Sequence, residues 1–276
     1  MSKRGINQKE KSELLKQQRL GVEKYNNQGC LMKVVEYNSS SDVVVEFQDK
    51  YKWKTKTTWY HFTNGILYNY YYPNVYGVGI TGNKYPTMTN SIKHKEYVTW
   101  CSMLQRCFNV KKKQQCLSYQ NVTCCKEWLY YPNFYEWLHR QENFEVWLKT
   151  EKYCLDKDIL KKGNKIYSPE TCCLVPERIN HLFPNAKSIR GNLPIGVSYD
   201  KNKQKYKAQC SIRDSNNKTQ RIIRLGLYDT ITEAFNVYKN QKELEIQQIA
   251  QEEYEKGTIS KKCYEAMMKW EVEIGD

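Results

Sequence analysis

The most regular alternation of apolar and polar residues lies near the C-terminus, in residues 205–213. Its apolar members are Tyr206, Ala208, Cys210 and Ile212, and its polar members are Lys205, Lys207, Gln209, Ser211 and Arg213. Because successive side chains of a strand point to opposite faces, this pattern predicts a strand with one core face and one basic face. Residues 193–255 as a whole predict three strands followed by one long helix.

The spacing of apolar residues differs in other parts of the chain. Residues 21–80 contain β-branched and aromatic runs, such as DVVVEFQDKY and KTTWYHFTNGIL, which predict a small antiparallel sheet ending near Ile80. Residues 93–150 place apolar side chains at helical spacing, as at Tyr97, Trp100 and Leu104. Residues 155–183 predict a strand, a loop with a turn at Gly163-Asn164, a second strand, and a short helix after Pro176.

These patterns predict a multi-domain α+β protein. The predicted divisions are a basic leader at 1–20, a small β module at 21–92, a mainly helical central module at 93–186, a three-stranded sheet plus helix at 190–256, and a C-terminal helix at 257–276. The leader is polar enough to be a solvated helix or a frayed arm. The stretch NAKSIRGN, residues 185–192, is a candidate hinge.

Composition and charge limit the classes of protein to which this chain can belong. The chain has 276 residues, of which 40% are hydrophobic, so it has enough apolar material for packed cores. Lys and Arg number 44 against 30 Asp and Glu, a net charge of +14, which indicates a polyanionic partner. No apolar run approaches the roughly 18–20 residues that a membrane span requires, and the start lacks a signal-peptide pattern. We therefore expect a cytoplasmic protein without a membrane partner.

The basic residues are densest around the predicted C-terminal sheet. Arg190 to Tyr228 contains nine Lys or Arg and two acids, Asp200 and Asp214. This density suits the phosphates along a DNA groove, with Gln209, Arg213 and Arg224 long enough to reach base edges. A basic solvated sheet without a bound partner is the alternative interpretation.

This C-terminal segment resembles the AP2/ERF DNA-binding domain over about 60 residues. The resemblance rests on Ile195-Gly196-Val197, Lys205-Tyr206-Lys207-Ala208, Leu225-Gly226-Leu227-Tyr228-Asp229-Thr230, Thr232-Glu233-Ala234-Phe235 and Tyr238. It implies three antiparallel strands in the major groove of double-stranded DNA, with a helix packed behind them. The candidate DNA-binding residues are Lys205, Lys207, Gln209, Arg213, Arg221 and Arg224. The chain lacks the tryptophan of the plant type on the second strand, which leaves base specificity open.

The central region resembles HNH-type endonucleases of phages and mobile elements over roughly 85 residues. The matching positions are Trp100, Met103, Arg106, Cys107, Cys125, Glu127, Trp128, Leu155, Asp156, Gly163, Asn164, Tyr167, Ser168, Pro169, Glu170 and Asn180. The resemblance implies a ββα-like core and, paired with an AP2-like domain, a homing or nicking endonuclease that uses Mg²⁺ or Mn²⁺.

The first histidine of an HNH site is missing, and Asp156 stands at or near its position. A carboxylate is a weak base for water but a good ligand for a hard cation. If LDKDIL is a strand, Asp156 and Asp158 share one face, with Asn164 across the turn, and the three form a candidate metal site. Asp156, Asp158 and His181 are the candidate catalytic residues, with His181 replacing the missing base. The alternative is a strand whose charges are merely solvated.

Two further features remain open. Eleven cysteines in a reducing compartment favour thiols or a metal site over disulfides, but no Cys-x-x-Cys spacing is present, so buried thiols are favoured over structural Zn²⁺. In residues 21–80, aromatic residues interleave with Lys50, Lys52, Lys54 and Lys56. They form either a second nucleic-acid contact or an ordinary sheet core with a lysine-protected edge.

The leading hypothesis is therefore a DNA-binding, HNH-like endonuclease. The alternative is a catalytically degenerate DNA-binding regulator that uses the AP2-like sheet. An RNA-binding or membrane-surface protein would account for the charge but not for the two ordered sets of motifs.

Overall fold

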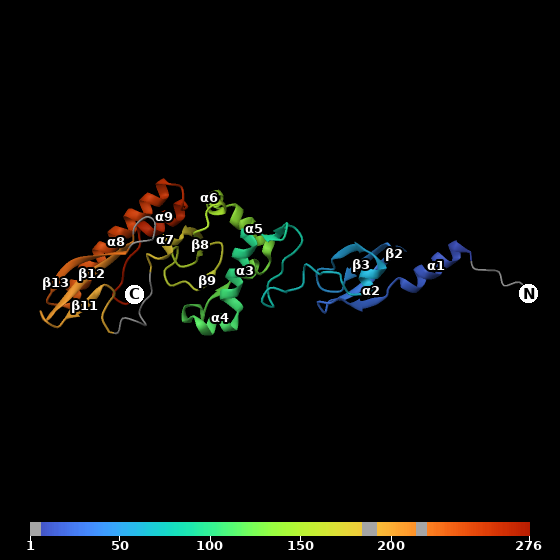
Figure 1. Ribbon diagram of the computed structural model, residues 1–276, viewed down its shortest axis with the longest axis horizontal. Coiled ribbons are helices and arrows are strands. Elements are labelled where there is room, and N and C mark those ends of the chain that lie inside the picture. The colour runs from blue at the N-terminus through green and yellow to red at the C-terminus, as the bar shows by residue number, and fades with distance from the viewer. Residues whose placement is uncertain (1–6, 184–191, 214–219) are drawn as a thin grey trace, which may run out of the picture. The chain divides into compact units, whose positions relative to one another are not determined.

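Helices and several small sheets alternate along the chain in the computed structural model, which confirms the α+β class (Figure 1). The structure describes residues 7–183, 192–213 and 220–276. The chain separates into two units, Met1–Pro86 with Leu129–Pro132, and Thr87–Trp128 with Asn133–Asp276. The hinge predicted at 185–192 lies almost wholly outside the described residues.

The first unit contains an antiparallel sheet of four strands in sequential order. Its elements are α1 (Gln8–Arg19), β1 (Glu23–Tyr25), β2 (Leu31–Ser39), β3 (Asp42–Phe47), β4 (Lys54–Thr57) and α2 (Trp59–Thr63). Val43, Val45 and Phe47 alternate toward a core that also contains Met32 and Phe62. This alternation is the period-2 signal that predicted the sheet.

The sheet ends earlier than the sequence predicted. Residues 59–63 form α2 instead of continuing the strand, because the hydroxyl of Thr58 accepts a hydrogen bond from the backbone N–H of His61. A threonine at the N-cap satisfies one of the free donors of the first turn and so favours helix over strand. Phe62 then packs into the sheet core from this short helix.

The second unit begins with short strands and helices around three tryptophans. Its first elements are β5 (Met88–Thr89), β6 (Ile92–Lys93), α3 (Lys95–Phe108), α4 (Val110–Gln115), β7 (Thr123–Cys124) and α6 (Phe144–Lys149), together with α5 (Tyr131–His139), whose first two residues belong to the first unit. Trp100, Trp128 and Trp147 are buried, and the Trp100 indole donates to the carbonyl oxygen of Trp128 at 2.7 Å. The helical periodicity predicted for residues 93–150 is thus confirmed.

An antiparallel strand pair followed by a short helix comes next. β8 (Tyr153–Asp156) pairs with β10 (Cys173–Pro176), and α7 (Glu177–Asn180) follows directly. Between them, β9 (Ile166–Tyr167) pairs in parallel with β7. The order of strand, loop, strand and helix agrees with the sequence pattern, and the register places Asp156 opposite Cys173.

The C-terminal part of this unit is a three-stranded antiparallel sheet backed by a long helix (Figure 1). Its elements are β11 (Val197–Asp200), β12 (Lys205–Arg213), β13 (Gln220–Tyr228), α8 (Ile231–Glu255) and α9 (Lys261–Met268). A capping box starts α8: the Thr230 hydroxyl accepts from the N–H of Glu233, whose carboxylate accepts from the N–H of Thr230. Of the residues 257–276 predicted as a C-terminal helix, only Lys261–Met268 form one, α9.

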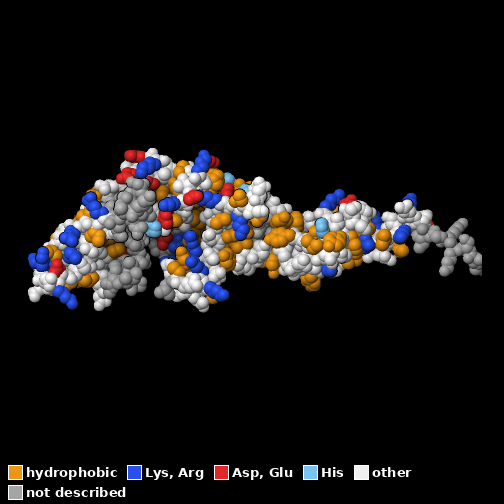
Figure 2. Space-filling model, viewed as in Figure 1, with side chains coloured by type: hydrophobic (Ala, Val, Ile, Leu, Met, Phe, Trp, Pro, Cys, Tyr) orange, Lys and Arg blue, Asp and Glu red, His pale blue; other side chains and the backbone are white. Residues whose placement is uncertain are grey.

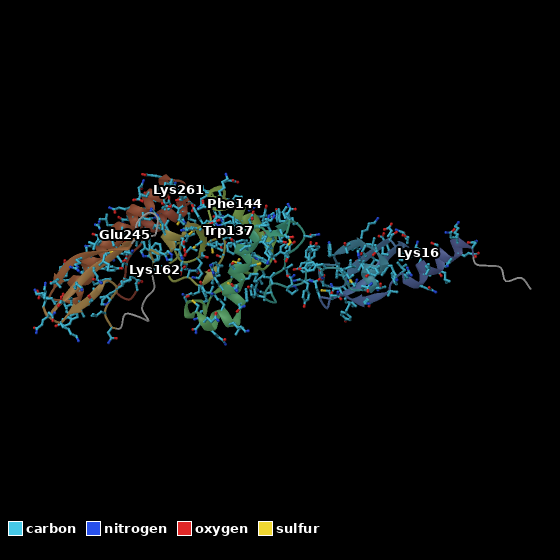
Figure 3. The ribbon with its side chains drawn as sticks, viewed as in Figure 1. Lys16, Trp137, Phe144, Lys162, Glu245 and Lys261 are labelled. Carbon is cyan, nitrogen blue, oxygen red and sulfur yellow. The ribbon has the colours of Figure 1, made fainter. Side chains whose placement is uncertain are left out.

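Ala208 and Cys210 of β12 pack with Ala234 and Phe235 of α8 in a core that also includes Val175 of β10. Lys242 and Glu245 of α8 form a buried ion pair at 2.8 Å. Glu245 is labelled in Figure 3. Burial, followed by the neighbouring Glu245 carboxylate, raises the pKa of the Cys210 thiol to about 11. The C-terminal sheet and the β8–β10 pair therefore share one core.

Candidate nucleic-acid interface and acidic site

The two faces of the C-terminal sheet differ in chemistry. Ala208 and Cys210 are buried toward α8, and the residues that alternate with them leave the opposite face. On that outward face, Lys207 stands opposite Leu227 and Gln209 opposite Arg224. Arg224 is exposed, whereas Lys207 and Gln209 are half-buried. This is the separation of core and basic faces that the alternation predicted.

A β-bulge between Ala208 and Gln209 keeps this arrangement in phase. The register passes from Gly226 to Arg224, so Leu225 is the extra residue of β13 and packs against the core. Without the bulge, Leu225 would stand opposite Gln209, and Arg224 would face the core beside Cys210. The bulge thus places Arg224 beside Gln209 on the outward face.

Most of the outward charge is unneutralised. The Lys205 ammonium lies 3.0 Å from a carboxylate oxygen of Asp229, whereas within the described part of the chain neither Lys207 nor Arg224 has an ion-pair partner. Figure 2 shows Lys and Arg side chains spread over the end of the molecule that β11, β12 and β13 form. This face therefore has a positive potential suited to an anion.

Arg213 and Arg221 are the two remaining candidate DNA-binding residues of the sheet. Arg221 is out of phase with Ile222 and Arg224, so its side chain leaves the sheet on the side opposite to the outward face. Arg213 has the phase of Gln209 and Ser211 and ends β12, but its side chain lies outside the described residues. The structure thus groups Lys205, Lys207, Gln209 and Arg224.

The acidic candidates lie where β8 ends. One carboxylate oxygen of Asp156, Oδ1, accepts hydrogen bonds from the N–H groups of Asp158 at 2.9 Å and Ile159 at 2.8 Å. These bonds turn the chain out of the strand. Asp158 is consequently in the following loop, and the prediction that both aspartates share a strand face is wrong.

Electrostatics distinguish the two carboxyls. Asp156 is buried, and burial, followed by the nearby Asp158 charge, raises the pKa of its carboxyl. Asp158 is half-buried and has an ion pair with Lys157 at 3.1 Å. A cation between the two carboxylates would relieve their repulsion.

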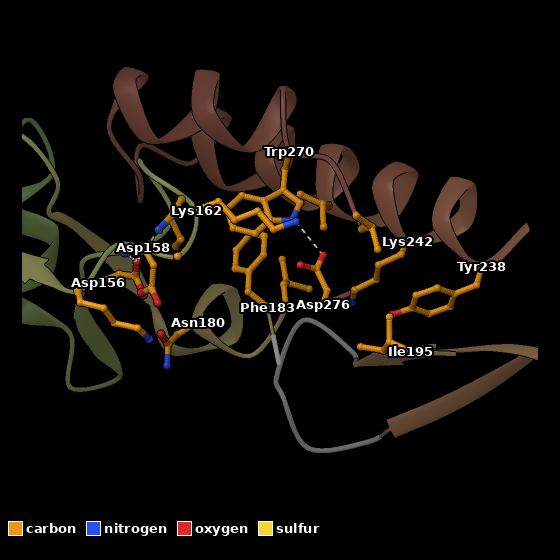
Figure 4. A pocket seen from close by; sticks show the side chains of 16 residues that line it. Asp156, Asp158, Lys162, Asn180, Phe183, Ile195, Tyr238, Lys242, Trp270 and Asp276 are labelled. Atoms are coloured by element: carbon orange, nitrogen blue, oxygen red, sulfur yellow. Dashed lines mark hydrogen bonds and ion pairs between the residues drawn. The ribbon is translucent and has the colours of Figure 1, made fainter. Parts of the chain in front are cut away.

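Asp156 and Asp158 nevertheless line one cavity, of about 360 Å³. Asn180 at the end of α7 lines it too, and Figure 4 shows these three side chains at one end, with Tyr238 at the other. Lys162 closes one side, with its ammonium 2.8 Å from a carboxylate oxygen of Asp276. Asn180 is one of the positions that match the HNH-type pattern, but it was not predicted as a ligand. No sequence pattern indicated a role for Lys162.

Asn164 and His181 lie apart from this cavity. The Asn164 amide nitrogen donates to the carbonyl oxygens of Lys157 and Ile166, both at 2.7 Å, and so holds the loop between β8 and β9. His181 lines a different cavity, of about 400 Å³, together with Gln209, and its Nε2 is 3.6 Å from a carboxylate oxygen of Glu177. The structure therefore does not place His181 or Asn164 among the residues that line the aspartate cavity.

The oxygen donors of the aspartate cavity are of the kind that a hard cation binds, although Lys162, Lys165 and Lys242 line the same cavity. Mg²⁺ commonly binds one or two carboxylates, keeps several waters and takes further oxygens from substrate phosphates. Asp156 and Asp158 supply two carboxylates, and Asn180 adds an amide oxygen. Across the described ranges, no group of three or more His, Cys, Asp or Glu side chains is arranged to hold a metal ion.

All eleven cysteines are free thiols, and six of them are buried. They include both members of the Cys172–Cys173 dipeptide, so neither faces an open ligand position. Burial raises the pKa of Cys172 well above its usual range, which disfavours the thiolate that zinc requires.

Comparison of the chain with protein-family models, curated proteins and solved structures finds no match. Among the helices in the described residues, none combines the length and apolar character needed to cross a bilayer.

Proposed function

We propose that this chain binds double-stranded DNA through the outward face of its C-terminal sheet. The observation that supports this most directly is the position of Lys207, Gln209 and Arg224 on one face, opposite a face on which Ala208 and Cys210 pack against α8. A β-ribbon can enter the major groove of B-DNA, where cations contact phosphates. The AP2/ERF resemblance leads to the same docking of strands.

The neighbouring Gln209 and Arg224 form a pair suited to base edges. Arginine binds guanine and glutamine binds adenine through two hydrogen bonds each, and the register places these two residues directly across from one another. Lys207, one pair further along the sheet, is placed for a phosphate. Lys205 contributes less charge, because Asp229 pairs with it.

A second activity, metal-dependent cleavage of DNA, is favoured by the aspartate cavity. Asp156 and Asp158 are close enough for the charge of Asp158 to raise the pKa of Asp156. Both lie at or just after the end of β8, which pairs with β10 and precedes α7, the order of elements that an HNH-like enzyme would require. Bound Mg²⁺ or Mn²⁺ would stabilise negative charge on the phosphate and the leaving oxygen. The base role predicted for His181 stays a prediction, as does the alternative of a non-catalytic regulator.

Replacing Lys207 and Arg224 together by Ala should weaken duplex binding about 30- to 150-fold, since each cation contact contributes on the order of 1–1.5 kcal/mol. Fluorescence anisotropy with a labelled duplex of mixed sequence at fixed salt measures the effect. Arg221→Ala removes one arginine from the strand that carries Arg224, but on the other face, and should change affinity less than threefold. Equal losses for both variants would exclude the outward face as the contact surface.

A further inference from the structure

The N-terminal unit carries a stack of three tyrosine rings. The centres of the Tyr51 and Tyr71 rings are 4.8 Å apart with planes 30° apart, and those of Tyr71 and Tyr130 are 6.3 Å apart with planes 20° apart. Tyr51 ends the stack and is 39% exposed. The stack therefore reaches the surface at Tyr51.

A cavity of about 380 Å³ lies at this end of the stack, lined by Lys50, Tyr51, Tyr71, Tyr72 and Pro73 among others. Figure 2 shows that hydrophobic side chains, tyrosine included, cover much of this unit. The cavity thus combines flat aromatic surface with a cation at its rim, which is the composition of sites that bind unpaired bases.

The other polar side chains of the cavity are already hydrogen-bonded. Asp49 accepts from the N–H of Tyr51 at 2.8 Å through Oδ1 and from the Asn69 amide at 2.7 Å through Oδ2. The Gln48 amide oxygen accepts from the Lys52 ammonium at 2.8 Å, and its amide nitrogen donates to the carbonyl oxygen of Glu46. The cavity therefore offers ring faces instead of a pattern of donors and acceptors for reading base edges.

Lys50 differs from the other lysines of this segment. Lys52 and Lys54 lie near Glu46 at 3.7 and 3.5 Å, and Lys56 pairs with Asp42 at 3.2 Å. In the part of the chain that the structure describes, Lys50 has no carboxylate partner, and its ammonium lies 4.9 Å from the centre of the Tyr51 ring. An exposed cation–π contact is weaker than stacking of a base, so a base can displace Lys50 toward a phosphate.

We propose that this tyrosine cavity binds single-stranded DNA. Bases stack on Tyr51 and Tyr72, and Lys50 pairs with a phosphate of the same strand, with little preference for sequence. The choice of DNA over RNA rests on the duplex-binding function proposed above. When the C-terminal sheet holds a DNA molecule, a second site on the same chain meets any unpaired segment of that molecule at a high effective concentration. The site itself is separate from the C-terminal sheet in sequence and in residues.

The test uses the full chain carrying Lys207→Ala and Arg224→Ala, so that the sheet contributes little to binding. A labelled oligothymidylate of about 12 nucleotides is the probe, followed by anisotropy. Adding Tyr51→Ala and Tyr72→Ala should weaken binding by at least about 30-fold, whereas Tyr51→Phe and Tyr72→Phe should keep it, because phenylalanine preserves the stacking face. Tyr25→Ala with Tyr60→Ala is the matched control, since these tyrosines are 63% and 65% exposed but do not line the cavity.

Lys50→Gln supplies a second variant that leaves every ring in place. It should reduce the slope of log K against log salt by about 0.7, the value for one phosphate contact on a single strand. Unchanged affinity in the Tyr→Ala variant together with an unchanged slope in Lys50→Gln would overturn the proposal. So would tenfold tighter binding of the matching RNA, or Tyr-dependent binding of a proline-rich peptide without binding of the oligonucleotide. Failure of the sheet to bind DNA would instead appear in the duplex titration, which the tyrosine variants leave unchanged.

Discussion

Asp156→Asn should lower metal-dependent cleavage of supercoiled plasmid by more than about 100-fold, because loss of even an outer-shell partner of a metal costs 10- to 100-fold. The substitution is selective. Asparagine keeps the oxygen that accepts from the N–H groups of Asp158 and Ile159, so the turn after β8 is preserved. It removes only the negative charge, which a carboxylate-held Mg²⁺ or Mn²⁺ would need.

Conversion of supercoiled plasmid to nicked or linear form, in Mg²⁺ or Mn²⁺, measures this effect. Asp158→Asn should lose activity similarly, whereas Asp200→Asn is the matched control, since the Asp200 side chain accepts from the N–H of Asn202 in an exposed turn away from the cavity. His181→Ala tests the base role. Full activity in Asp156→Asn would remove the aspartate cavity from the chemistry, and absence of cleavage on bound DNA would favour the regulator.

Gly196→Ala should destabilise the second unit by about 2–5 kcal/mol, the sum of backbone strain and overpacking. Gly196 has φ +77°, and a Cβ added there would lie 2.1 Å from the Tyr238 ring. Tyr238 is buried between α8 and the sheet, so its ring has little room to move. The carbonyl oxygen of Gly196 also accepts a hydrogen bond from the N–H of Gln209. A shift of the backbone at Gly196 in the variant would therefore disturb the edge of β12.

Urea denaturation followed by circular dichroism measures the loss in stability. Gly163→Ala is the matched control, because Gly163 has φ +73° but no atom within 4 Å of the added Cβ. It should lower the free energy of unfolding by only about 1–2 kcal/mol, the cost of a left-handed backbone conformation for a residue with a Cβ. Equal losses for the two variants would show that the Tyr238 contact adds nothing.

The sequence predicted the C-terminal sheet well because its signals are local. The alternation around Ala208 and Cys210 specifies which face is buried, and Thr230 with Glu233 marks the start of α8. Both depend on neighbours within a few residues. The phase of Arg224 depends on a bulge at Leu225, which the alternation of one strand does not reveal.

The candidate metal site was harder to predict, since it depends on where side chains bond rather than on residue type. LDKDIL has strand-like alternation, but the Asp156 carboxylate turns the chain after a single acid. The same kind of local bond, from Thr58, converts a strand-like aromatic run into α2. Asn180 comes beside the aspartates only through the pairing of β8 with β10, a contact between segments distant in sequence.

The central claim is that the outward face of the C-terminal sheet neutralises DNA phosphates, and the salt dependence of duplex binding tests it most directly. The slope of log K against log salt should be shallower by about 0.9 in the Lys207→Ala, Arg224→Ala variant than in the wild type, since Lys207 contributes one phosphate contact of about 0.9 and Arg224 is placed for a base edge. Arg221→Ala should leave the slope within about 0.3 of the wild type. Parallel lines for the double variant and the wild type would contradict the account.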